Sequence, residues 1–293
     1  MRLAGGEYAH RLDGRFSYAS LAFDDAGDAE RRDVMTLAVE RAGARAWSSS
    51  FYVWIAIGFA LTIFLSFAPT YWAPVAAGQF HGNPIVHIHG MVFFAWTLFV
   101  VLQASLVANG QTALHRSLGL LGISLATAMV ILGALVTLNS LTTAEAVGLG
   151  ARGEAFVIAP LSGIAAFAIF VALAVANVTR PEIHKRLMVL SMIAIVDAPL
   201  GRPFMVFVFT ALPPGPPPLW ALLPAYAVAD LFLAAAMLYD WRTRGRPHPV
   251  YLIGGAAIVA EQLLRWPLSQ TAGWHHLARA FASLGGAFPP PHG

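Results

Sequence analysis

Long apolar stretches recur along this chain, separated by short polar segments. Seven of them lie near residues 51–68, 87–108, 117–138, 156–178, 186–210, 218–240 and 250–266. An apolar helix of about 20 residues crosses the roughly 30 Å hydrocarbon layer of a bilayer. The pattern therefore predicts an all-α, polytopic membrane helix bundle with about seven transmembrane helices. Whether the seventh stretch crosses fully stays open.

Composition then narrows the chemistry. The chain is 58% hydrophobic and only 11% charged, far below the roughly 25% charged residues of a soluble domain, so we expect the lipid bilayer as its surroundings. It contains no cysteine, which excludes disulfides, thiolate metal sites and thiol nucleophiles. A metal or haem would have to bind to His, Met, Asp or Glu. The net charge of +3 forms no basic patch, so no nucleic-acid partner is predicted.

Basic residues alternate between the loops. They precede the first predicted span and follow the second, fourth and sixth, whereas the first and fifth loops have none. The positive-inside rule then predicts a cytoplasmic N-terminus, and seven spans would place the C-terminus outside. Three parts are expected: a cytoplasmic N-terminal arm over 1–46, the transmembrane bundle over 47–268, and an interfacial helix with a Pro-rich tail over 269–293.

Charged residues also fall inside the predicted spans, where each is costly unless it is paired or functional. Asp197 and Asp230 are expected near the bilayer midplane, Glu261 at a similar depth, and Arg202 and Arg265 nearer the outer face. Either the acids neutralise these arginines inside the bundle, or they form a protonatable pathway. Asp230 has no basic residue at its own depth, which makes it the best candidate for a protonatable or ligand-contacting group.

Two histidines open predicted spans on the same side of the membrane. His115 stands in the phrase LHRSLG and His184 in IHKRLM, so the two side chains could face each other. Neutral imidazoles from two helices are the usual axial ligands of a b-type haem. The alternative is that both are interfacial residues that bond lipid headgroups or helix ends.

Three more histidines are expected near the outer face, where His81, His87 and His89 form a candidate site for copper, zinc or iron. Residues two apart in a helix point about 200° apart, so His87 and His89 could share an ion only if the chain is extended there. His89 lies on one helical face with Trp96 and Gln103. We therefore expect His89 to face the bundle interior.

These phrases carry a resemblance. HIHG, LHRSLGLLG and IHKRLMVLSMIAI resemble a family of uncharacterised bacterial multi-span membrane proteins, known only as a domain of unknown function. The resemblance covers roughly residues 85–205, and the family's histidines correspond to His89, His115 and His184. It implies a location in the bacterial inner (plasma) membrane and brings no activity with it.

A more distant likeness is to the ascorbate-reducible di-haem b-type cytochromes. Their four-helix core carries one histidine per helix, which makes two haem sites. The fourth span here, near 156–178, has no histidine. The resemblance therefore supports one haem at most.

Three functions remain open. In the first, the protein is redox-related: His115 and His184 hold haem b, a transition metal or a quinone, and His89 serves a separate site, with a quinone or a redox protein as partner. In the second, the three intramembrane acids drive a proton-coupled transporter or permease, with Arg202 as counter-ion. In the third, the protein is an accessory or assembly subunit of a membrane complex. The first is favoured because the histidines recur at helix ends, whereas the acids are scattered one per helix.

Overall fold

The computed structural model describes residues 50–80 and 82–287, and all regular structure in this part is helical. Six helices are long and apolar enough to cross a membrane, namely Ser50–Ala76, Pro84–Ala108, Gly119–Ala146, Gly150–Ala176, Pro181–Val208 and Leu219–Arg244. The predicted all-α membrane bundle is thus confirmed. The chain divides into two units, Met1–Ser50 and Phe51–Gly293, and the fold described here is that of the second. The predicted N-terminal arm lies outside the described residues.

The elements follow one another with short connections. The helix that begins at Ser50 ends in the π-helix η1 (Ala68–Trp72) and α2 (Ala73–Ala76). The later elements are α3 (Pro84–Ala108), α4 (Thr112–Ser117), α5 (Gly119–Ala146), α6 (Gly150–Phe156), α7 (Ile158–Ala176), α8 (Pro181–Pro203), the π-helix η2 (Phe204–Val208), the 3₁₀-helix η3 (Leu219–Leu222), α9 (Leu223–Arg244), α10 (Pro249–Ser269), α11 (Ala272–Ser283) and η4 (Leu284–Ala287).

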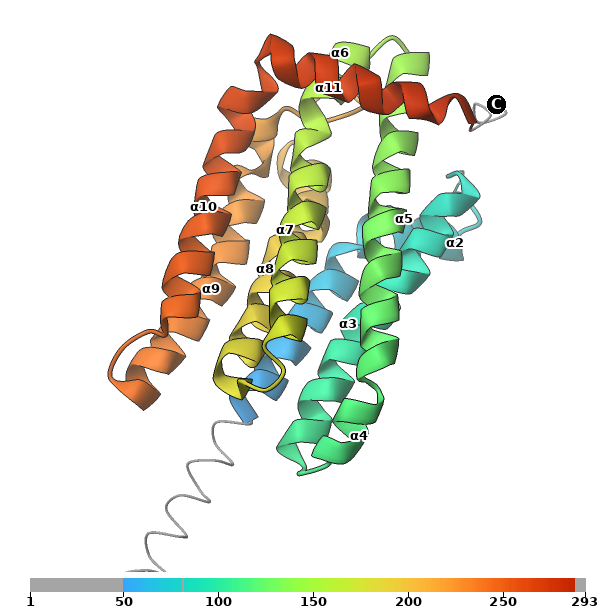
Figure 1. Ribbon diagram of the computed structural model, residues 1–293. Coiled ribbons are helices and arrows are strands. Elements are labelled where there is room, and N and C mark those ends of the chain that lie inside the picture. Colours follow the sequence, from blue (N-terminus) through green and yellow to red (C-terminus); the bar gives the residue numbers. More distant parts are fainter. Residues whose placement is uncertain (1–49, 81, 288–293) are drawn as a thin grey trace, which may run out of the picture. The chain divides into compact units, whose positions relative to one another are not determined.

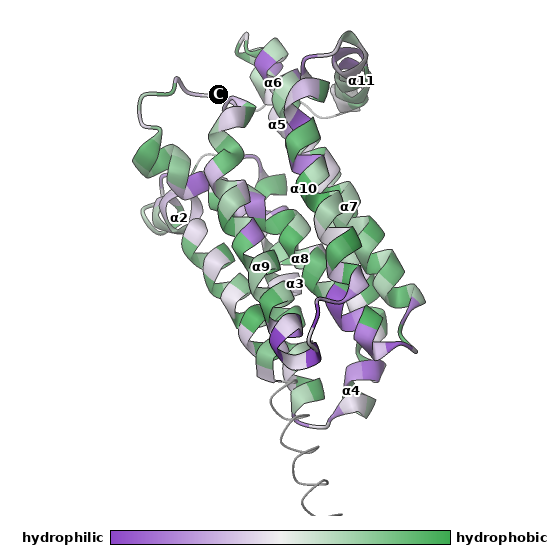
Figure 2. Ribbon diagram, turned by 90° about the vertical axis from the view of Figure 1, so that its left-hand side faces the viewer, coloured by the Kyte–Doolittle hydropathy of each residue, from purple (hydrophilic) through white to green (hydrophobic). Residues whose placement is uncertain are grey.

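Successive long helices run in opposite directions through the bundle (Figure 1). One end, which we call the α4 end, contains α4 and the connections from α7 to α8 and from α9 to α10. The opposite end, the α6 end, contains α6 and α11, which lies across the helices. Hydrophobic residues dominate the long helices, and hydrophilic ones gather around α4 and near α6 and α11 (Figure 2).

Helix α8 lies at the centre of the bundle. In its most apolar window 67% of the residues are buried, against 22–44% in the other five spans. It packs against α7, α9 and α10. The fully buried side chains include Trp96, Phe167 and Leu190, whereas Leu120 and Ile253 are mostly exposed on the outside. Lipid suits these exposed apolar side chains, because the tails are as apolar as they are.

Helix α10 corresponds to the seventh apolar stretch. It packs against α7, α8 and α9 and is therefore part of the bundle. It is not among the six helices that qualify as spans by length and composition. Its second half carries Glu261, Gln262 and Arg265, which lower its hydropathy.

Local sequence sets several helix ends. Asn83 caps α3, because its side-chain oxygen accepts a hydrogen bond from the Ile85 backbone N–H at 3.1 Å and Pro84 fits the first turn. Gly245 ends α9 with a φ of 74°, a left-handed conformation that glycine adopts without steric cost. Inside α8, Pro199 and Pro203 cannot donate helical hydrogen bonds, and the helix continues as the π-helix η2.

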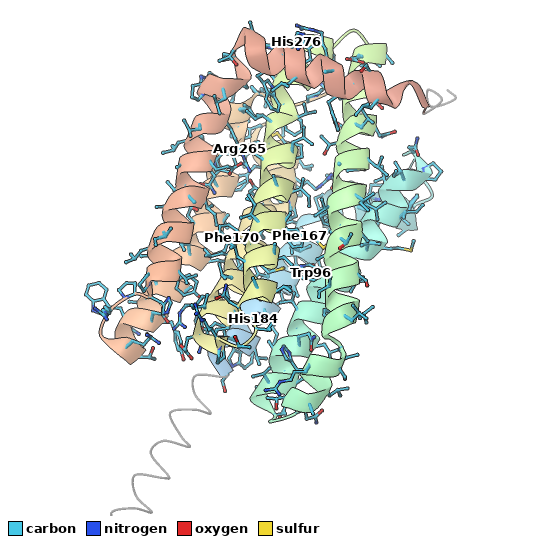
Figure 3. All side chains as sticks on the ribbon, viewed as in Figure 1. Trp96, Phe167, Phe170, His184, Arg265 and His276 are labelled. Atoms are coloured by element: carbon cyan, nitrogen blue, oxygen red, sulfur yellow. The ribbon has the colours of Figure 1, made fainter. Side chains whose placement is uncertain are left out.

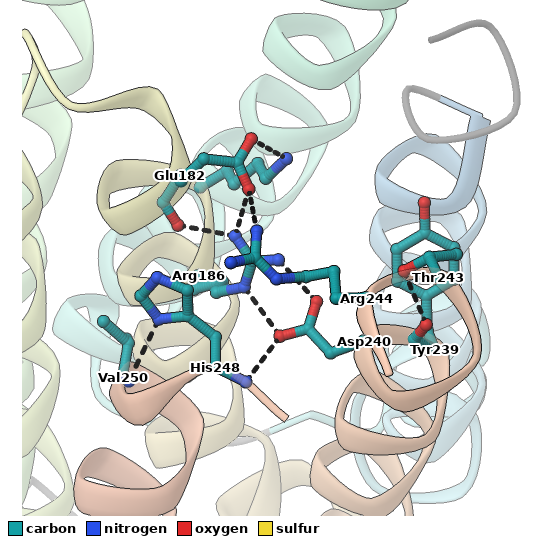
Figure 4. A network of polar contacts seen from close by, with 9 residues as sticks. Glu182, Arg186, Tyr239, Asp240, Thr243, Arg244, His248 and Val250 are labelled. Carbon is teal, nitrogen blue, oxygen red and sulfur yellow. Dashed lines mark hydrogen bonds and ion pairs between the residues drawn. The ribbon is translucent and has the colours of Figure 1, made fainter. Parts of the chain in front are cut away.

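A closed ion-pair network ties the α4 end together (Figure 4). Arg186 on α8 binds both carboxylate oxygens of Asp240 on α9, at 2.8 and 2.5 Å, and also binds Glu182 at 2.7 Å. Asp240 additionally accepts from the backbone N–H of His248 at 3.0 Å, and Glu182 accepts from Arg244. We call these five residues the Arg186 network. In the sequence, its basic residues are recognisable only as loop charges.

Candidate functional site

The structure brings His115 and His184 together at the α4 end. Their ring centroids are 6.3 Å apart and the ring planes meet at 84°. His115 comes from the short helix α4 and His184 from the first turns of α8, which are far apart in sequence. Both side chains are half-buried. Figure 3 shows His184 near this end and Arg265 toward the other.

The ring of His184 is fixed by a backbone group. Its Nδ1 lies 2.8 Å from the carbonyl oxygen of Ala174 on α7. A carbonyl can only accept, so Nδ1 donates this bond and Nε2 takes no part in it. Histidines that ligate metals are commonly oriented through such a bond from the other ring nitrogen. The ring of His184 is therefore oriented by this bond, with Nε2 on its other side left for a ligand.

The surroundings of His115 favour its neutral form. Its Nδ1 is buried and makes no hydrogen bond of normal geometry with the described residues. Burial and the neighbouring His184 lower the pKa of His115, so its imidazole is uncharged at neutral pH. Gln103 on α3 donates from Nε2 to the backbone carbonyl of His115 at 3.2 Å. Ligand binding by imidazole requires this uncharged form.

His87 and His89 do not share a site, because their side chains make different contacts. Helix α3 begins at Pro84, so His87 and His89 are both helical and the extended chain that sharing an ion would require is not found. His87 Nδ1 lies 2.8 Å from the Tyr71 hydroxyl, whereas the His89 ring packs on Phe93 with centroids 4.0 Å apart. This packing agrees with an inward-facing His89.

The predicted site of His81, His87 and His89 stays a prediction, because His81 lies outside the described residues. Within the described ranges, no group of three or more His, Asp or Glu side chains is placed to hold a metal ion. From His89 to the end of α3 at Ala108 the helix rises about 29 Å, so the outer histidines cannot share a ligand with His115.

Two of the three intramembrane acids meet one arginine. Arg265 Nη1 binds Asp197 at 2.5 Å, and its Nε binds Glu261 at 2.7 Å and the Ser162 hydroxyl at 3.1 Å. The guanidinium lies 5.0 Å from the ring centroid of Tyr226. Arg265 is only 2% exposed. We call these five residues the Arg265 cluster. Its geometry matches the interpretation in which acids and arginine neutralise each other inside the bundle.

Asp230 and Arg202 lie apart from this cluster. Asp230 accepts a long hydrogen bond of 3.4 Å from Gln262 on α10, and no basic side chain pairs with it within the described residues. Arg202 lies over the ring of Phe67, 4.5 Å from its centroid, and contacts the Thr70 hydroxyl at 3.5 Å. It forms no ion pair with the acids in the described part of the chain.

Several contributors to these sites escaped the sequence analysis. The Ala174 carbonyl orients His184 through the backbone and leaves no side-chain signal. Gln103 was grouped with His89 by its spacing, yet its amide reaches His115 instead. Ser162 looked like one of many small residues in an apolar span. In the sequence, such a contributor could be recognised only as a polar side chain at the same end of the bundle as a histidine. Of these three residues, only Gln103 meets that description.

The fold and this site define an integral membrane helix bundle with a paired-histidine site at one end. No protein-family model matches the chain, and neither a curated protein nor a solved structure matches it. Function must therefore be argued from the geometry of the chain's own residues.

Proposed function

We propose that the protein is a redox protein of the membrane, in which His115 and His184 are the axial ligands of a b-type haem. The observation that carries this proposal is the 6.3 Å between their ring centroids. Two imidazoles that each bind one metal ion at about 2.0 Å place their ring centroids roughly 6 Å apart. The spacing supports a single metal centre between the two rings.

The number of ligands favours haem over a bare ion. A bare transition-metal ion in a protein usually needs three or four protein ligands. Haem iron takes its four equatorial ligands from the porphyrin and needs only two axial ones from the protein. The described part of the chain supplies two histidines here and no third His, Asp or Glu side chain. A transition metal alone is therefore the less favoured occupant.

Each residue of the pair then has a definite role. The Ala174 carbonyl holds the His184 ring and keeps Nε2 free to ligate, and the lowered pKa of His115 keeps its imidazole uncharged. Gln103 holds the His115 backbone. Bound haem would supply reversible one-electron transfer. A membrane quinone or a redox protein is the partner that this chemistry requires.

Orientation follows from charge. The α4 end carries Arg116, Arg180, Lys185, Arg242, Arg244 and Arg246. By the positive-inside rule this end faces the cytoplasm of a bacterial inner membrane, together with the N-terminus, and α11 with the C-terminal tail lies at the outer face. The haem would then lie near the cytoplasmic surface.

Neither alternative function gains a comparable observation. The transport hypothesis needs free intramembrane acids, yet Asp197 and Glu261 are both paired with Arg265, which leaves Asp230 alone. The assembly hypothesis predicts no particular geometry. His89 as a second cofactor site also stays a prediction.

An absorption spectrum of the detergent-purified protein tests the proposal. We expect a Soret band that shifts on reduction with dithionite, together with about one iron per chain by elemental analysis. His115→Ala and His184→Ala should each abolish the band, because one axial ligand is lost. His276→Ala, at an exposed histidine on α11 at the other end, is the matched control and should keep it.

Two results would overturn the proposal. One is a colourless, metal-free protein from cells grown with excess haem precursor. The other is a reducible Soret band that survives in both alanine variants, which would place the haem elsewhere in the chain.

A further inference from the structure

A cavity of about 350 Å³ lies at the α6 end, between η3 with the start of α9 and the last turns of α10. This volume falls within the range of small-molecule sites. Most of its lining is apolar and includes Trp220 and Trp266, which are 42% and 48% exposed. Leu223 and Leu263 are exposed as well. The cavity therefore opens on the outer surface of the bundle, where lipid lies.

The polar part of the lining includes hydrogen-bond donors. Tyr226, Gln262 and Arg265 line the cavity, and each is less than 10% exposed. The Tyr226 hydroxyl is buried, and its O–H has no acceptor of normal hydrogen-bond geometry among the described residues, since the nearby Arg265 can only donate to its oxygen. A buried O–H without an acceptor costs free energy unless something else accepts from it. A ligand that accepts a hydrogen bond would satisfy this group.

Charge decides which acceptor fits. The guanidinium of Arg265 lines the cavity and disfavours a cation, but its charge is already offset by Asp197 and Glu261, so an anion gains little. A neutral acceptor such as a carbonyl oxygen meets donors without adding a charge. The indoles of Trp220 and Trp266 provide faces against which a flat ring can stack.

We propose that this cavity binds the ring of a lipid-soluble quinone, with a quinone carbonyl accepting from Tyr226 and the isoprenoid tail leaving between α9 and α10 into the bilayer. The site lies at the opposite end of the bundle from the histidine pair. Its occupancy does not depend on haem, so either proposal can fail alone.

Tryptophan fluorescence tests the inference, because quinones quench indoles on contact. The full chain in phosphatidylcholine nanodiscs is titrated with decylubiquinone, and saturable quenching is expected. Leu223→Trp fills the cavity and should weaken binding more than tenfold. Tyr226→Phe removes the donor and should weaken it roughly five- to tenfold. Tyr239→Phe is the matched control, since Tyr239 also has an unpartnered buried hydroxyl but lies at the α4 end, and it should bind normally.

Further measurements separate quinone binding from misfolding of a variant and from non-specific binding of an acyl chain. Trp220→Phe and Trp266→Phe should each reduce the quenching amplitude without changing the fold, which keeps the test valid if Leu223→Trp does not fold. Decylbenzene, which has the tail and a ring but no carbonyl, should not compete with the quinone. The inference is overturned if the filled and wild-type cavities bind alike, if quenching never saturates, or if decylbenzene competes equally, because the cleft would then hold only acyl chains.

Discussion

Two buried arginines, one near each end of the bundle, invite comparison. Arg186 and Arg265 are 1% and 2% exposed, and each binds two carboxylates. In both cases one carboxylate comes from the same helix, one turn away, and the other from a neighbouring helix. A single sequence rule, an acid four residues before an arginine, accounts for half of each arrangement.

The two arginines differ in whether their guanidinium groups can still contact a ligand. All three guanidinium nitrogens of Arg186 bind carboxylate oxygens. The backbone N–H of His248 donates a further hydrogen bond to Asp240. Arg265 instead shares its Nε between Glu261 and Ser162, and its guanidinium lines a cavity. A closed network fixes helices to one another, whereas a network that borders a cavity can also meet a ligand. We therefore interpret Arg186 as structural and Arg265 as available for recognition.

Asp240→Asn should have the largest effect on stability. It leaves the buried Arg186 without its main counter-charge, and breaking such a pair costs about 3–5 kcal/mol. Glu182→Gln is the matched control, because the Glu182 side chain is 51% exposed and its loss should cost about 1 kcal/mol or less. Both are measured by reversible unfolding in mixed micelles, followed by circular dichroism. Equal losses for the two variants would show that the network is not closed around Asp240.

Asp197→Asn should cost less, about 1–2 kcal/mol, because Arg265 keeps Glu261 and Ser162. The same unfolding assay measures it. This order of effects is what separates the two arginines. If Asp197→Asn destabilises the bundle as much as Asp240→Asn does, the Arg265 cluster is a structural tie of the same kind.

The fold was largely predictable from the sequence, since the bilayer imposes a length and a composition on each span. The first six predicted stretches each coincide with one of the six qualifying helices. The seventh shows the limit of this argument. Helix α10 packs with the bundle although its charged residues lower its hydropathy, because Arg265 pairs with Asp197 on α8 and with Glu261 on α10 itself.

The sites were predictable only in part. The facing of His115 and His184 could be expected, because both open spans on the same side of the membrane. The pairing of Arg186 with Asp240 joins residues 54 apart, and that of Arg265 with Asp197 joins residues 68 apart. Such pairs depend on helix rotation and packing, which one sequence does not reveal. The cavity could not be predicted from the sequence for the same reason.

Acidification should produce the smallest of these effects, and at the α4 end. His248 caps α10, because its Nδ1 accepts a hydrogen bond from the Val250 backbone N–H at 3.1 Å. Burial and the charges of Arg186 and Arg244 lower the pKa of His248. Protonated Nδ1 cannot accept, so protonation breaks the cap. The unfolded chain takes up this proton near its ordinary pKa of about 6.5, before the folded chain does.

The contribution of this cap is therefore complete above about pH 6.5, declines as the pH falls below it, and is lost once the pH has passed the pKa of the folded state. We expect a loss of about 1 kcal/mol, the usual value of a helix cap. His248→Asn keeps an acceptor that does not titrate, so it should match the wild type near pH 7.5 and lose less stability near pH 5.5. An unchanged decline in this variant would assign the pH dependence to another group, and His115 is the first to test, because burial and His184 lower its pKa at the same end.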